Sequence, residues 1–230
     1  MALVLKQVKL SKGGFLLSAD FELKTGSLTS VMGPSGAGKS TLFDGLAGFI
    51  APDQGTVEFD GVVLNAHEPG RRPIAILFQD NNLFPHLTAG QNIGLALSHK
   101  RRLTPAQMMQ VDSVLARLGL EGMAERSLSQ LSGGQLSRVA LARMLLLDRP
   151  VWLLDEPFAA LGPSLKRDML ALVKDMAAEV GATVLMITHD PSDALGLSDE
   201  TILVADDHVS GPFSTKDLLA DPPEALRQYL

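Results

Sequence analysis

The sequence predicts an α/β fold built on a mostly parallel sheet, with an antiparallel part at the amino end and an inserted all-helical lobe. Three observations predict it. Apolar runs such as Val151–Leu154 alternate with helical patterns such as Pro163–Glu179, which is typical of parallel strands covered on both faces. Residues 3–10 and 15–23 alternate apolar and polar side chains, as antiparallel partners do. Between residues 80 and 149 only helical patterns occur.

Length and composition narrow the class of protein. With 230 residues, 46% of them hydrophobic, the chain is long enough for one substantial core. A net charge of −6 argues against binding to nucleic acid or to anionic lipid, since both favour a basic surface. The absence of cysteine excludes disulfides and thiolate metal sites. No apolar run approaches the ~20 residues of a membrane helix, and Met1–Lys6 lacks the features of a signal peptide, so we expect a cytosolic chain.

The amino-terminal half begins with two strands joined by the turn Lys12-Gly13-Gly14. Asp60-Gly61 indicates a second hairpin. The further strands expected in this half are Leu28–Met32, Val57–Phe59, Val62–Leu64 and Ile74–Phe78, with one helix over Thr41–Phe49 that ends near Gly48.

Helices dominate the middle of the chain, and strands return after it. The helical patterns cover Thr88–Leu97, Pro105–Leu118 and Gly134–Leu147; the later strands are Val151–Leu154, Thr183–Ile187 and Thr201–Val204. The chain then ends about 25 residues after the last expected strand. Because no linker separates these parts, residues 1–230 are expected to form a single domain, with a core at about 1–79 and 150–230 and a helical lobe at about 80–149.

A glycine-rich loop lies between the strand Leu28–Met32 and the helix that starts near Lys39. It reads Gly33-Pro34-Ser35-Gly36-Ala37-Gly38-Lys39-Ser40-Thr41 and matches the phosphate-binding loop. Its glycines let backbone N–H groups approach a β-phosphate, and Lys39 supplies a charge for the β- and γ-phosphates. Ser40 is a candidate ligand of Mg²⁺, and Thr41 of a phosphate oxygen. The alternative is a glycine-rich turn with a chance lysine. The loop places the chain among the P-loop NTPases, with a RecA-like core.

Two acids follow the apolar run Val151–Leu154. The carboxyl end of a strand is where sheets of this type bind ligands. Asp155 is expected to hold Mg²⁺ directly or through water, and Glu156 to polarise an attacking water as general base. The alternative is a solvated strand end before the turn at Pro157.

Gln79 and His189 also follow buried strands. The amide of Gln79 is expected to reach the metal or the attacking water and to respond to the γ-phosphate. The imidazole of His189 is expected to donate a hydrogen bond to the γ-phosphate and so to distinguish ATP from ADP. A surface amide and a structural histidine are the alternatives.

A second candidate phosphate site precedes the helical pattern of Gly134–Leu147. Ser132, Gly133, Gly134 and Gln135 lie at the amino end of that helix, where backbone amides can meet an anion. An ordinary capped loop is the alternative. Two phosphate cradles with a single nucleotide loop suggest a site completed by another copy of the chain.

With these elements in this order, the chain resembles the ATP-binding subunits of ABC transporters over essentially its whole length. The resemblance implies a head-to-tail dimer that buries two ATP molecules, with Mg²⁺, between the phosphate loop of one copy and the Ser132–Gln135 loop of the other. It further implies transmembrane permease subunits as partners, a periplasmic solute-binding protein as an indirect partner, no nucleic acid, and a peripheral place on the cytoplasmic face of the bacterial inner membrane.

A narrower resemblance is to the thiamine-import ATP-binding proteins of bacteria. It rests on Arg71-Arg72-Pro73, on the stretch from Leu77 to Thr88 and on Gln91-Asn92-Ile93-Gly94-Leu95. Leu83, Phe84 and Leu87 are the residues expected to contact a permease, or else to form part of the helical lobe's core. Within transport, the alternatives are import of iron, sulfate or polyamines, or export of an unknown solute. A non-transport ABC ATPase would have coiled coils or basic arms, and a P-loop kinase would have no Ser132–Gln135 loop.

Two positions depart from the family pattern. The usual adenine-stacking aromatic would stand near Lys12, where this chain has no aromatic; Phe15 is the nearest substitute. Gly162 stands where the family usually has an aspartate that links the two sites across the dimer. Without this aspartate, strong coupling between the two sites is not expected, but ATP hydrolysis still is.

Overall fold

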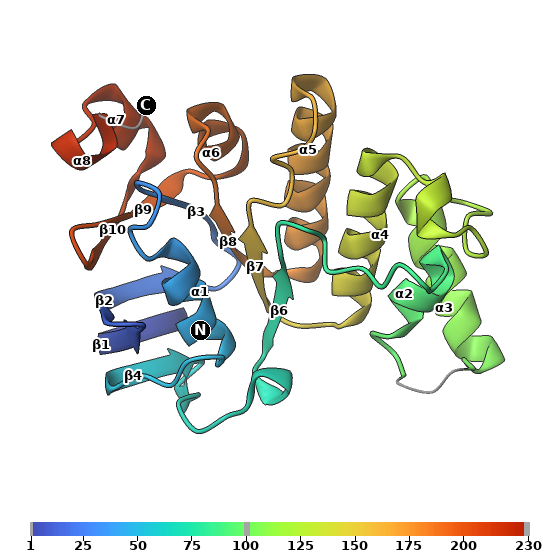
Figure 1. Cartoon of the computed structure of the whole chain (residues 1–230), viewed down its shortest axis with the longest axis horizontal. Helices are drawn as coiled ribbons and strands as arrows, with labels where there is room; N and C mark the ends of the chain where they lie inside the picture. The colour runs from blue at the N-terminus through green and yellow to red at the C-terminus, as the bar shows by residue number, and fades with distance from the viewer. Residues whose placement is uncertain (1, 99–101, 228–230) are drawn as a thin grey trace.

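The computed structural model describes residues 2–98 and 102–227. The described strands form one ten-stranded sheet in the order β5-β4-β1-β2-β10-β9-β3-β8-β7-β6 (Figure 1). The strands are β1 Ala2–Lys12, β2 Phe15–Lys24, β3 Leu28–Met32, β4 Gln54–Phe59, β5 Val62–Val63, β6 Ile74–Leu77, β7 Val151–Asp155, β8 Thr183–Ile187, β9 Glu200–Ala205 and β10 His208–Ser214.

The helices gather in groups around this sheet. In Figure 1, α2, α3 and α4 lie together at one end of the molecule, while α6, α7 and α8 lie near the opposite end. Their bounds are α1 Lys39–Ala47, α2 Ala89–Gly94, α3 Pro105–Arg117, α4 Gly133–Leu146, α5 Pro163–Val180, α6 Pro191–Leu197, α7 Thr215–Ala220 and α8 Glu224–Arg227, with 3₁₀ turns η1 Pro69–Arg71 and η2 Leu128–Gln130. None of the helices formed by the described residues combines the length and apolar character that a membrane crossing requires.

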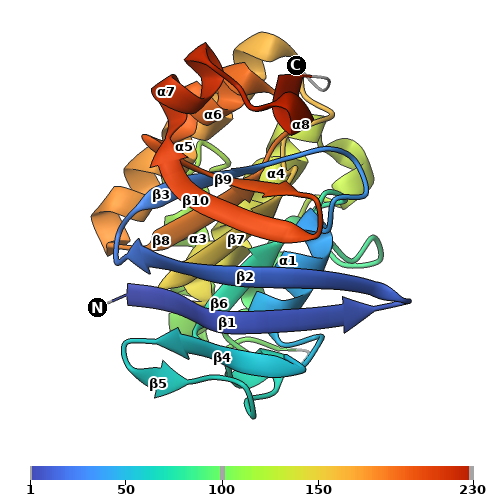
Figure 2. The ribbon, with the colours of Figure 1, turned by 90° about the vertical axis from the view of Figure 1, so that its left-hand side faces the viewer.

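The amino-terminal antiparallel part agrees with its sequence prediction. β1 pairs with β2, and Lys12 lies opposite Phe15 across the two-glycine turn. β4 pairs with β5 around Asp60 and Gly61, both of which have positive φ, as the tightest hairpin turns require. Figure 2 shows β2, β1 and β4 side by side, with the short β5 next to β4.

The central strands β9, β3, β8, β7 and β6 are parallel to one another, as predicted. Successive residues of β7 are buried on opposite faces of the sheet. Trp152 and Leu154 belong to one hydrophobic cluster, and Val151 and Leu153 to another. Both faces of these strands are therefore covered, which explains their continuous apolar runs.

The helices of residues 80–149 share their core with one face of the sheet. Val111 of α3 and Leu141 of α4 belong to the same buried cluster as Leu77 of β6 and Val173 of α5. One continuous cluster therefore joins the helical region to the strands that precede and follow it.

Several element ends differ from the sequence prediction. The first helix starts at Lys39 instead of Thr41 and ends at Ala47, where Gly48 adopts a left-handed conformation with φ 88°. The predicted helix Thr88–Leu97 is wrong at its carboxyl end, since α2 stops at Gly94. Beyond that point the backbone continues in single turns, with Ala96 N donating to Ile93 O.

The prediction that Thr201–Val204 is the last strand is wrong. β10 follows it and pairs antiparallel with β9 and parallel with β2. This strand joins the antiparallel part to the parallel core. Its only fully buried residue is Val209, and the interruption Gly211-Pro212 disguises it in the sequence.

Candidate functional site

Four functional segments leave the same edge of the sheet. The neighbouring strands β3, β8, β7 and β6 are parallel, so their carboxyl ends lie side by side. The phosphate loop follows β3, His189 follows β8, Glu156 follows β7 and Gln79 follows β6. The fold thus brings together four predicted site segments that are separated by up to about 150 residues in the sequence.

The phosphate loop needs glycine at specific positions. Gly33 passes so close to β9 that an added Cβ would lie 2.0 Å from Val204 O. Gly36 has φ 80°, and Gly38, the N-cap of α1, has φ 101°. Both φ angles lie in the left-handed region, which residues other than glycine rarely adopt. The loop is therefore a fixed backbone cradle that opens at the amino end of α1, where an anion is favoured.

Lys39 lies within this loop and is buried. Its Nζ donates to the carbonyls of Gly33 at 2.7 Å and Pro34 at 2.8 Å. Burial lowers the pKa of its ammonium group, while the charges of Glu156 and Asp155 act in the opposite direction. The ammonium therefore lies in the electric field of both acids at the carboxyl end of β7. This is the arrangement expected of a cation that binds a phosphate between those acids and the loop.

The two acids have different environments. Burial, then the charges of Glu156 and Asp44, raise the pKa of the Asp155 carboxyl, with Lys39 opposing them. Glu156 is the first residue beyond β7 and has φ 44°, a strained conformation for a residue other than glycine. Its backbone N donates to Ile187 O at 3.2 Å, which attaches it to the end of β8.

His189 meets Glu156 directly. The imidazole Nδ1 lies 3.1 Å from Glu156 Oε2. A carboxylate so placed can both orient the imidazole and accept a proton from a water beside it.

The residues predicted to hold Mg²⁺ offer oxygen donors of three kinds. They are the hydroxyl of Ser40, the amide of Gln79 and the carboxylate of Asp155. Gln79 and Asp155 line the same open cavity of about 720 Å³. Hard oxygen donors are those that Mg²⁺ prefers, so this chemistry fits the ion.

Phe15 packs on the phosphate loop. An added Cβ at Gly38 would lie 2.7 Å from Cε1 of the Phe15 ring. Phe15 is half-buried. Lys12, at the position expected for the missing aromatic, is instead paired with Asp44 of α1 at 2.6 Å.

The Ser132–Gln135 loop lies at the amino end of α4. Ser132 caps the helix and forms a capping box with Gln135. Gly134 permits close packing, since an added Cβ would lie 2.6 Å from the side chain of Leu165. In Figure 1, β6 and β7 lie between α1 and α4, so one chain does not bring this loop onto its own phosphate loop.

Sequence reasoning gave no role to three cationic side chains near the site. Arg143 of α4 donates to the carbonyls of Asn82 at 2.7 Å and Asn81 at 3.2 Å, in the loop after Gln79. The guanidinium of Arg72 is buried and donates to Gly45 O and Leu46 O of α1, both at 2.7 Å.

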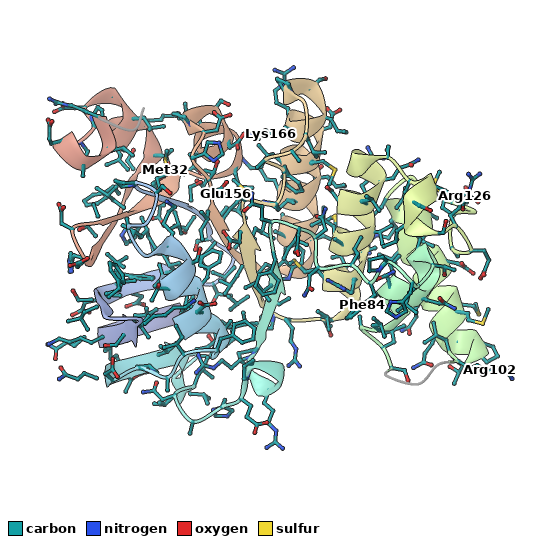
Figure 3. The ribbon with its side chains drawn as sticks, viewed as in Figure 1. Met32, Phe84, Arg102, Arg126, Glu156 and Lys166 are labelled. Carbon is teal, nitrogen blue, oxygen red and sulfur yellow. The ribbon has the colours of Figure 1, made fainter. Side chains whose placement is uncertain are left out.

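Lys166 is the third of these side chains. Figure 3 shows it at the amino end of α5, close to Glu156. A cation at helical spacing gives no signal in the sequence, because its partners are set by the packing of distant segments.

Gly162 is the N-cap of α5, and no side chain caps that helix end. Glycine has no side-chain oxygen that could accept from the first N–H groups of this helix.

Comparison with known proteins places these features in a family. Residues 16–159 match the family model described as ABC transporter. The thiamine import ATP-binding protein of Ruegeria sp. is 50% identical over 226 residues, 98% of each chain. The proteins of the same name from Cereibacter sphaeroides and Vibrio vulnificus are 51% and 45% identical over 98% and 99% of this chain, each match covering 98% of the relative.

Among solved structures, the chain is similar to the ATP-binding cassette MJ0796 in a dimeric post-hydrolysis state bound to ADP and Pi. The TM-score is 0.78 with 29% sequence identity, and the match covers 94% of this chain and 99% of the other.

Proposed function

This chain belongs to the ABC transporter family, and from that premise we propose that it is the ATP-hydrolysing subunit of a bacterial importer of thiamine. The main support for ATPase activity is the shared edge of the sheet, where the phosphate loop, Glu156 and His189 lie together. The assignment of thiamine as the solute rests on the near full-length similarity to thiamine import ATP-binding proteins.

The phosphate loop binds the nucleotide. In this proposal the backbone N–H groups of residues 33–38 and the ammonium of Lys39 hold the β- and γ-phosphates. Thr41 supplies a hydroxyl at the start of α1. Phe15 supports the base from beside Gly38, where its ring lies. Ser40, Asp155 and Gln79 would hold Mg²⁺, which when bound would offset the negative charge of the phosphates.

Hydrolysis requires one water to be activated next to the γ-phosphate. Glu156 accepts the proton of that water, and the strained backbone at this residue fixes where its carboxylate points. His189 donates a hydrogen bond to the γ-phosphate, and its contact with Glu156 keeps the two groups together. Gln79 completes the edge beside Asp155 and responds to loss of the γ-phosphate.

The second half of each site comes from another copy. Ser132, Gly133, Gly134 and Gln135 lie at the amino end of α4, and in Figure 1 β7 and β6 lie between α4 and α1. These residues are therefore proposed to contact the ATP bound by a second copy in a head-to-tail dimer. Residues 80–149 act as a helical lobe within the single domain, and closing and reopening of the dimer drive the permease.

The proposed setting follows from this role. The chain binds transmembrane permease subunits on the cytoplasmic face of the inner membrane, and a periplasmic solute-binding protein delivers thiamine to the other side. Leu83, Phe84 and Leu87, in the stretch after Gln79, are the proposed permease contacts. Phe84 is exposed, whereas Leu83 is partly buried and also packs against the core of the helical lobe.

Uptake of labelled thiamine in the source organism tests the solute. Deletion of the gene is expected to abolish uptake, and the wild-type gene, but not Glu156→Gln, to restore it. If no second thiamine importer is present and deletion leaves uptake unchanged, the solute is not thiamine; uptake of iron, sulfate and polyamines by the same strains then identifies the rival.

A further inference from the structure

Lys166 forms a two-carboxylate ion pair behind the catalytic edge. Its side chain is 14% exposed, and Nζ lies 2.7 Å from Asp193 Oδ2 and 3.0 Å from Asp190 Oδ2. Burial alone would lower the pKa of this ammonium, but the hydrogen bonds to Asp193 and Asp190 together raise it. Lys166 therefore stays charged at neutral pH and attracts both acids.

Both acids follow His189 in the chain, and Asp193 reaches back to the residue before it. Asp190 follows it directly and caps α6, with Oδ1 accepting from Ser192 N at 2.9 Å. Asp193 is buried and accepts from Thr188 Oγ1 at 2.9 Å, on the other side of His189. The backbone that carries the imidazole is thus attached at both ends to carboxylates that Lys166 holds.

Lys166 also belongs to the segment that leaves Glu156. Only six residues separate Glu156 from the start of α5 at Pro163, and Lys166 lies in the first turn of that helix, where its N donates to Gly162 O at 3.0 Å. Glu156, Lys166, His189 and Asp193 line one small cavity. The ion pair therefore crosses from the segment after Glu156 to the segment with His189.

We propose that Lys166 is a positioning residue for ATP hydrolysis, whose ammonium holds residues 188–193 against α5 and so sets the contact between His189 and Glu156. The inference rests on the proposed ATPase function. Lys166 itself touches neither reacting atoms nor nucleotide; it acts through the two groups that do. A charge pair at this place is stiffer than an apolar contact, because the ammonium satisfies two carboxylates with fixed hydrogen bonds.

Steady-state ATPase kinetics of the purified full chain test the proposal. Lys166→Met is expected to lower kcat about tenfold to a hundredfold, as displacement of a catalytic group by ~1 Å does. KM for ATP is expected to stay within about twofold, because the phosphate loop is untouched. Lys166→Arg, which keeps the charge, is expected to recover most of kcat. Arg117→Met, which breaks the ion pair with Glu179 at the far end of α5, is the matched control and is expected to behave as wild type.

A double variant distinguishes the proposed positioning role of Lys166 from a purely structural role. Lys166→Met leaves Asp193 buried without its cation and can lower stability. Lys166→Met combined with Asp193→Asn removes both charges, and the amide oxygen that replaces the carboxylate can still accept from the Thr188 hydroxyl. The proposal expects the double variant to regain thermal stability but not kcat.

Two results would overturn the positioning role. One is an unchanged kcat in Lys166→Met; the other is recovery of kcat together with stability in the double variant. Absence of turnover in wild type and Arg117→Met alike would overturn the ATPase function as well, so the two failures are distinguishable.

Discussion

The imidazole Nδ1 of His189 lies 3.1 Å from Glu156 Oε2, although the two residues are separated by 33 positions in the chain. The contact exists because β7 and β8 are parallel neighbours whose registers place Asp155 opposite Ile187. Each chemical group then follows its own strand by one or two residues. The two neighbouring strands thereby place the proposed base, Glu156, beside the proposed hydrogen-bond donor, His189.

The role of Glu156 as base gives the first prediction. Glu156→Gln keeps the size of the side chain but cannot accept a proton, so ATP turnover is expected to fall by about 10²- to 10⁴-fold. ATP binding is expected to persist, and the ATP-bound dimer to accumulate in gel filtration with ATP and Mg²⁺.

Glu179→Gln is the control for that experiment, because Glu179 is an exposed acid near the end of α5 that pairs only with Arg117 among the described residues. It is expected to hydrolyse ATP as the wild type does. Robust turnover by Glu156→Gln would remove Glu156 as the base.

The position of Phe15 gives the second prediction. Its half-buried ring packs against Gly38 of the phosphate loop. If the ring supports the adenine base, Phe15→Ala loses a stacking contact of about 1 kcal/mol, equivalent to a roughly fivefold higher Kd for ATP. Equilibrium binding of a fluorescent ATP analogue measures it. Phe213→Ala removes an exposed ring of β10 as control, and an unchanged Kd in Phe15→Ala excludes the platform.

Two glycines of the phosphate loop give a matched pair of substitutions. Gly33→Ala would place a Cβ 2.0 Å from Val204 O, so β9 or the loop must move. The Cβ added by Gly36→Ala would have no atom within 4 Å, so its only cost is the strain of a residue other than glycine at φ 80°.

We expect Gly36→Ala to lower the free energy of unfolding by about 1–2 kcal/mol, the cost of a left-handed residue. Gly33→Ala is expected to cost more, because overpacking against backbone adds to conformational strain. Urea denaturation measures both. Equal losses would show that the close approach to Val204 is relieved without cost.

The cap of α6 makes stability depend on pH. The hydrogen bond from the Ser192 side chain, opposed by burial and aided by Lys166, lowers the pKa of Asp190 from 3.8 to about 2. Between these values the unfolded chain binds a proton that the folded chain does not. The stabilising contribution is therefore complete above pH 3.8 and is lost as the pH falls towards 2.

Asp190→Asn tests this dependence, since asparagine can still cap the helix but does not titrate. Stability measured by denaturation from pH 5 to 2 is expected to fall less steeply in the variant than in the wild type. Parallel curves for the two proteins would show that Asp190 does not contribute.

Much of the architecture could be predicted from the sequence, because local patterns and tertiary packing agree. Apolar runs such as Val151–Leu154 became strands buried on both faces, and Asp60-Gly61 became a hairpin. β10 could not be read, because Gly211-Pro212 interrupts it and it is a strand only through its pairing with β9 and β2.

The sequence by itself determined where the phosphate loop and the two acids at the end of β7 lie in the chain. Spacing along the chain defines both motifs, and the strands before them are strongly apolar. Only the tertiary structure decided which side chains surround them. Lys166 became the partner of Asp190 and Asp193 because α5 packs beside α6, and Phe15 came to lie on Gly38 because β2 returns across the loop. Such contacts depend on the order of strands in the sheet, which sets what is adjacent in space and leaves no periodic signal in the chain.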